Sequence, residues 1–89
     1  MKINEKFVLR QLVDTWVVLP LADKTIDFNG MMTLNESGVL LWNTLEKGAD
    51  MDMLVKALTS EYAVSTEQAK SDVEEFIQKL RSSGCLEQQ

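Results

Sequence analysis

The sequence contains no histidine, a single cysteine (Cys85) and a single proline (Pro20) among its 89 residues. Without histidine the chain lacks the usual general base near neutral pH, and it cannot build zinc sites of the cysteine and histidine type. One cysteine excludes an internal disulfide framework, and a free thiol suits a reducing compartment. We therefore expect no metal site, no cofactor and no disulfide.

Long apolar runs are also missing. No segment approaches the roughly 20 consecutive apolar residues that span a membrane, and the first residues lack the apolar stretch and cleavage site of a signal peptide. We expect a cytoplasmic protein without a membrane partner. Positive charge is scarce as well, since 9 Lys and Arg against 14 Asp and Glu give a net charge of -5. An acidic surface disfavours nucleic acid and anionic lipid as partners and favours a peptide or protein.

What the sequence does contain is 45% apolar residues, enough for one core. We expect one domain over residues 1–89, because a chain of this length buries only about two thirds of its unfolded surface. Three β-prone runs come first, at about residues 7–13, 16–21 and 25–34. The dipeptide Asp14-Thr15 predicts a hairpin turn between the first two.

The third run has the clearest strand alternation. One parity is apolar and is expected to face the core, whereas the other is mostly polar and is expected to face outward. The core parity comprises Ile26, Phe28, Met32 and Leu34, and the outer parity Asp27, Asn29, Met31 and Thr33. Met31 is the exception on the outer parity, and an exposed flexible thioether suits an adaptable peptide-binding surface.

Helical spacing and capping signals predict three helices, at about residues 35–47, 51–62 and 66–83. The first begins near Thr33 or Asn35, because residues 33–36 match a capping box. Asp50 caps the second helix, and Ser65 with Gln68 forms a capping box for the third. Gly48 and Gly84 supply helix stops. The order predicts an α+β, winged-helix-like fold in which a three-stranded antiparallel sheet is followed by three helices.

Winged-helix folds often read DNA, so a DNA-binding transcriptional regulator is the alternative function. Charge argues against it, because a helix that enters a DNA groove needs a net basic exposed face. The third helix instead carries more acids than bases, with Lys70, Lys79 and Arg81 against Glu67, Asp72, Glu74 and Glu75.

Catalytic residues are not indicated either. The acidic pairs Asp50/Asp52 and Glu74/Glu75 are accounted for by a helix cap and by solvated helix surface. Cys85 follows Gly84, where a helix stop places an apolar contact back on Leu80, so a packed thiol is expected rather than a nucleophile. We expect no enzyme.

A longer pattern carries a resemblance to a known family. It runs Phe28-Asn29-Gly30-Met31-Met32-Thr33-Leu34-Asn35-Glu36, followed by Trp42, Gly48, Tyr62, Asp72-Val73, Phe76, Leu80 and Gly84. Over residues from about 7 to 86 the chain resembles the PqqD-like family, the pyrroloquinoline quinone biosynthesis protein D type domains also called RiPP recognition elements. The resemblance implies a non-catalytic peptide chaperone that binds the leader of a ribosomally made precursor peptide. It presents the precursor to a modifying enzyme, often a radical S-adenosylmethionine enzyme.

The resemblance also implies where the leader binds, namely as an added strand in the groove between the third strand and the third helix. An edge strand has unpaired backbone groups that an extended peptide can satisfy. Carried over by position, the expected peptide-binding residues are Phe28, Asn29, Met31, Thr33 and Leu34 on the strand, and Asp72, Phe76 and Lys79 on the helix. The opposite helix flank, with Lys70, Glu74 and Arg81, stays open as the other choice. The same edge can accept a second copy of the chain, so a homodimer is expected when no leader is present.

Overall fold

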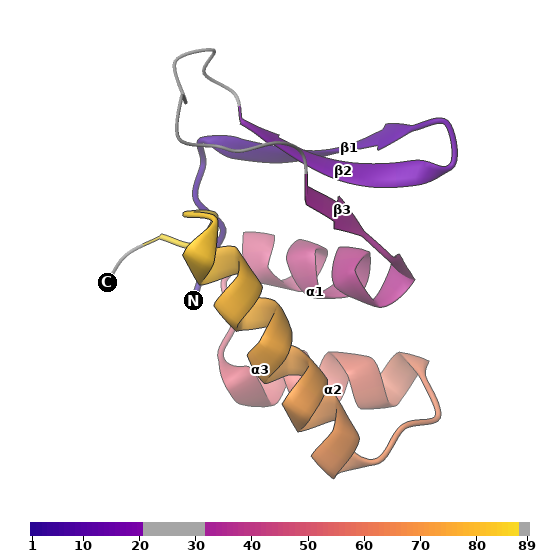
Figure 1. The fold of residues 1–89 in the computed structure, drawn as a ribbon. Coiled ribbons are helices and arrows are strands. Elements are labelled where there is room, and N and C mark those ends of the chain that lie inside the picture. The colour runs from indigo at the N-terminus through magenta and orange to yellow at the C-terminus, as the bar shows by residue number, and fades with distance from the viewer. Residues whose placement is uncertain (21–31, 88–89) are drawn as a thin grey trace.

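In the part of the chain that the structure describes, three strands precede three helices (Figure 1). The computed structural model describes residues 1–20 and 32–87. The strands are β1 (Phe7–Leu12), β2 (Thr15–Pro20) and β3 (Met32–Leu34), and the helices are α1 (Glu36–Glu46), α2 (Met51–Glu61) and α3 (Thr66–Ser82). The predicted α+β fold, a small antiparallel sheet followed by three helices, is confirmed. Most of the predicted third strand lies outside the described residues.

The sheet has the order β1-β2-β3, and both pairings are antiparallel. Leu9, Val18 and Met32 lie side by side across the three strands and face the helices, and Leu34, two residues beyond Met32, is buried on the same face. Thr33 is exposed on the other face, as the alternation predicts. In the described sheet, β3 pairs with β2 on one side only, so β3 is an edge strand.

The hairpin turn differs from the prediction by one residue. Leu12 pairs with Thr15, so the turn residues are Val13 and Asp14 rather than Asp14 and Thr15. Val13 has a φ of 55° and its side chain is 91% exposed. A β-branched residue rarely adopts positive φ, and its strand propensity suggested the wrong position. Thr15 instead extends β2, because it completes the pairing with β1.

The three helices begin at side-chain caps. Asp50 Oδ1 accepts a hydrogen bond from Met53 N at 2.9 Å, and Ser65 Oγ accepts one from Gln68 N at 3.1 Å, as predicted. The cap of α1 is Asn35, so the capping box built on Thr33 was wrong: Thr33 lies in β3, where its backbone is extended. The Gln68 side chain also departs from the predicted box, because it donates to Asp72 Oδ1 at 2.9 Å.

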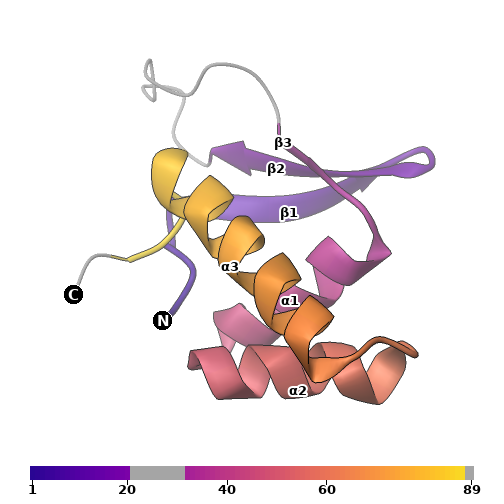
Figure 2. The same cartoon turned by 60° about the horizontal axis from the view of Figure 1, so that its bottom comes forward.

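The core lies between the inner face of the sheet and the helices. In both views α1 lies between the sheet and α2, and α3 runs from the level of the sheet to α2 (Figures 1 and 2). Trp42 and Leu45 of α1, Leu54 of α2, and Val73 and Leu80 of α3 are fully buried. This packing fixes one face of α3 against α2 and leaves its neighbouring flank beside β3.

Both helix stops take the expected conformation, with positive φ at Gly48 and Gly84. After the second stop, Cys85 N donates a hydrogen bond to Leu80 O at 2.9 Å. The Cys85 side chain is fully buried, and burial raises the pKa of its thiol from 9.0 to about 11. A thiol that stays protonated and covered is a packing element, as the sequence predicts.

Candidate functional site

A groove of about 460 Å³ separates β3 from α3 and reaches the first turn of α1. This groove is lined by residues from β3, the start of α1, α2 and one flank of α3. They are Thr33, Leu34, Asn35, Ser37, Gly38, Leu41, Leu58, Asp72, Glu75, Phe76 and Lys79. The volume falls in the range of ordinary ligand pockets.

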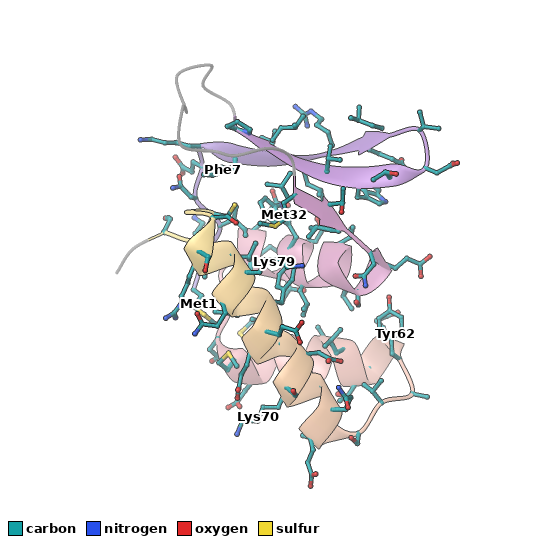
Figure 3. The ribbon with its side chains drawn as sticks, viewed as in Figure 1. Met1, Phe7, Met32, Tyr62, Lys70 and Lys79 are labelled. Carbon is teal, nitrogen blue, oxygen red and sulfur yellow. The ribbon has the colours of Figure 1, made fainter. Side chains whose placement is uncertain are left out.

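Helical spacing determines which α3 side chains reach the groove. Val73, Ile77 and Leu80 form the buried stripe of α3. Asp72, Phe76 and Lys79 lie at i, i+4 and i+7 on the flank beside that stripe, so they share one side of the helix. Figure 3 shows Lys79 on the part of α3 close to Met32, whereas Tyr62 lies at the far end of α2. The α3 wall of the groove therefore runs from Asp72 to Lys79.

Five of the eight predicted site residues line this groove, namely Thr33, Leu34, Asp72, Phe76 and Lys79. Phe28, Asn29 and Met31 lie outside the described residues. The structure also separates the two flanks of α3 that the sequence left open. Glu74 and Arg81 line a different hollow, together with Met51 of α2, on the other side of α3. Lys70 is exposed and does not line the groove.

The sequence reasoning did not include the first turn of α1 in the site. Asn35 Oδ1 accepts hydrogen bonds from Gly38 N at 2.9 Å and Ser37 Oγ at 3.0 Å, and all three residues line the groove. The sequence does contain a feature that indicates this turn, namely the helix cap at Asn35. A cap that directly follows an edge strand places the start of its helix beside that strand. Leu41 and Leu58 are buried core residues that also form part of the groove floor.

The groove has an apolar floor and a polar rim. Leu34, Leu41 and Leu58 are buried in the floor, whereas Asp72, Glu75 and Lys79 are exposed at the rim. Within the described part of the chain, no group of histidine, cysteine, aspartate or glutamate residues could hold a metal ion. None of the described helices is both long enough and apolar enough to cross a membrane. An apolar floor beside an edge strand suits an extended peptide.

A second hollow of about 390 Å³ continues the groove past Asp72. We call it the side hollow. It is lined by Asn35, Glu36, Ser37, Leu58, Tyr62, Val64 and Asp72, four of which also line the groove. Its walls combine apolar side chains from the end of α2 with two carboxylates, Glu36 and Asp72.

Two solved structures that are similar to this chain are leader-peptide complexes. One, described as TbiB1 in complex with the TbiA(beta) leader peptide, is 28% identical, has a TM-score of 0.79, and the match covers 100% of this chain and 98% of that chain. A second, lasso peptide synthetase B1 complexed with the leader peptide, is 21% identical with a TM-score of 0.75, over 94% of this chain and 93% of that chain. A comparison with curated proteins finds no match.

The family model for coenzyme PQQ synthesis protein D (PqqD) matches residues 15–86. The chain belongs to the PqqD family. The resemblance read from residues 28–36 and the helical positions is therefore confirmed. The part of the chain that matches the PqqD model includes β2, β3 and all three helices, so it contains every element that lines the groove.

Proposed function

We propose that this chain is a non-catalytic adaptor that binds the leader of a ribosomally made precursor peptide and presents it to a modifying enzyme. The observation that carries the proposal is the groove, which has an edge strand on one side and α3 on the other. A peptide added to β3 would satisfy unpaired backbone groups, while its alternate side chains would enter the groove. The related TbiB1 structure, bound to a leader peptide, supports this function.

The charges of the groove weigh against the alternative of DNA binding. The described ionisable side chains that line it are Asp72, Glu75 and Lys79, and together they give this part of the rim a net negative charge. Nucleic acid would require several basic contacts to phosphate on this surface. No feature of the described residues favours a transcriptional regulator over a peptide adaptor.

The partners beyond the leader follow from the family resemblance. We propose that the enzyme that receives the leader complex is of the radical S-adenosylmethionine type and that both proteins act in the cytoplasm. We also propose that the free edge of β3 pairs with a second copy when no leader is bound. Sedimentation of the whole chain with and without a bound peptide measures this association, and a chain that stays monomeric at high concentration without peptide would contradict it.

Peptide binding itself is tested by titrating the whole chain with the TbiA(beta) leader and with the leader of any precursor encoded beside its own gene. Duplex DNA is the comparison ligand. We expect saturable peptide binding that tolerates salt, with amide shifts concentrated in β3 and α3. DNA binding with a steep salt dependence, and no peptide binding, would overturn the proposal.

A matched pair of charge reversals locates the site on α3. Lys79→Glu changes a groove residue, whereas Arg81→Glu makes the same change on the other side of the same helix. We expect peptide affinity to change by at least about threefold in Lys79→Glu and to stay the same in Arg81→Glu. Equal effects in the two variants would place the peptide elsewhere.

A further inference from the structure

The side hollow has a chemistry that differs from the rest of the groove. Leu58 of α2, with Tyr62 and Val64 just beyond the end of that helix, gives it an apolar and partly aromatic wall. Glu36, in the first turn of α1, and Asp72 of α3 contribute carboxylates. Two elements far apart in the sequence therefore place negative charge beside the same apolar wall.

None of the described residues neutralises either carboxylate. Among the described residues, Glu36 and Asp72 form no ion pair, and the hydrogen bond that Asp72 accepts comes from the neutral Gln68 amide. Among the described residues, Lys79 is the one basic side chain that lines the groove, and it lies about 10 Å further along α3 than Asp72 by helical rise. The negative charge of the side hollow is thus available to a ligand.

Resting on the proposed function, we propose that the bound leader peptide carries an arginine or lysine whose side chain occupies the side hollow. The aliphatic stem would pack on Leu58 and Val64, and the cation would meet Glu36 and Asp72. The face of the Tyr62 ring can add a cation–π contact. Long basic side chains combine these two requirements, an apolar stem and a positive head.

The competing occupants fit less well. An acidic side chain would be repelled by two carboxylates of the same sign. A purely apolar side chain would cover the carboxylates without pairing with them, and desolvating an unpaired charge costs free energy. Position along the groove adds a second constraint. The 10 Å between Asp72 and Lys79 corresponds to about three residues of extended chain, so a peptide side chain beside Lys79 comes two or four positions from the basic one.

The inference is tested by selecting a displayed library of random linear peptides on three forms of the whole chain. The first is the unmodified protein, and the second carries Glu36→Gln with Asp72→Asn. The third is a matched control, Asp52→Asn with Glu67→Gln, which removes two acids from the first turns of α2 and α3, outside the groove and the side hollow. We expect arginine or lysine to be enriched at one position by the unmodified protein and by the control, and not by Glu36→Gln with Asp72→Asn.

One selected peptide is then synthesised with its basic residue and with glutamine there. We expect the glutamine peptide to bind the unmodified protein about fivefold more weakly and to bind the Glu36→Gln, Asp72→Asn protein no more weakly than its parent. Selected peptides without basic enrichment, or enrichment that survives the double substitution, would overturn the inference and leave the adaptor function standing. If the unmodified protein selects no peptide, the proposed function fails together with the inference.

Discussion

The cap of α1 offers a sharp test of how the groove is held, because α2 begins with a chemically similar cap that lies away from it. Asn35→Ala removes an acceptor used by Gly38 N at 2.9 Å and by Ser37 Oγ at 3.0 Å. Asp50→Ala removes the acceptor used by Met53 N at 2.9 Å. Losing such a cap costs about 0.5 to 2 kcal/mol of folding free energy, and typically about 1 kcal/mol. In a chain of this size each kcal/mol lowers Tm by about 4 to 8 °C.

The two substitutions should differ in peptide binding. Gly38 packs closely against the end of β3. A Cβ built on Gly38 would lie 3.2 Å from Leu34 Cβ and 3.3 Å from the Oδ1 atom of the Asn35 cap. If the first turn of α1 frays, β3 loses its contact with Gly38. A binding peptide must then re-form the turn, and part of its binding free energy is used to do so. Restoring about 1 kcal/mol of order weakens binding about fivefold in Asn35→Ala. Asp50→Ala should bind like the unmodified protein.

The assay combines thermal unfolding with fluorescence anisotropy of a labelled peptide obtained by selection on the unmodified protein. Anisotropy is measured well below the Tm of both variants, so that each is fully folded. An equal loss of affinity in both variants would mean that the groove responds to overall stability. Unchanged affinity in Asn35→Ala, despite the expected fall in Tm, would refute the role of the α1 cap in supporting β3.

Three further outcomes follow from single side chains. Val13→Gly should raise the free energy of unfolding by about 0.5 to 1 kcal/mol in thermal melts, because glycine removes the positive-φ strain that Val13→Ala retains. Between pH 9.0 and about 11 the free energy of unfolding should fall by up to about 2.7 kcal/mol. The cause is the raised pKa of Cys85, because the folded state keeps a thiol proton that the unfolded state releases in this range. Denaturant titrations of Cys85→Ala should not show this loss. Phe76→Ala should weaken peptide binding about tenfold in anisotropy titrations, while Phe76→Leu restores most of it and Gln78→Ala has no effect.

The helices were predictable because their signals are local. Asp50 and Ser65 each lie three residues before the backbone N–H that they cap, and Gly48 and Gly84 take the positive φ that ends a helix. The hairpin turn was misplaced for the converse reason. The pairing of Leu12 with Thr15 across the hairpin decides where the chain turns, and it places Val13 against its own propensity.

The groove depends on which flank of α3 faces β3, and the periodicity of the sequence does not determine this. The apolar stripe of α3 has two polar flanks, and the pattern of α3 alone is the same whichever flank faces the sheet. The packing of α3 on α2 makes the choice, so that Phe76 and Lys79 face β3 while Arg81 faces the other side. The Asn35 cap could have narrowed the location of the site from the sequence. Because this cap comes one residue after the edge strand, the start of α1 must border any peptide added to that edge. The groove thus depends both on the local Asn35 cap and on the tertiary packing of α3 against α2. The test on Asn35 probes the cap, and the test on Lys79 probes which flank of α3 faces the groove.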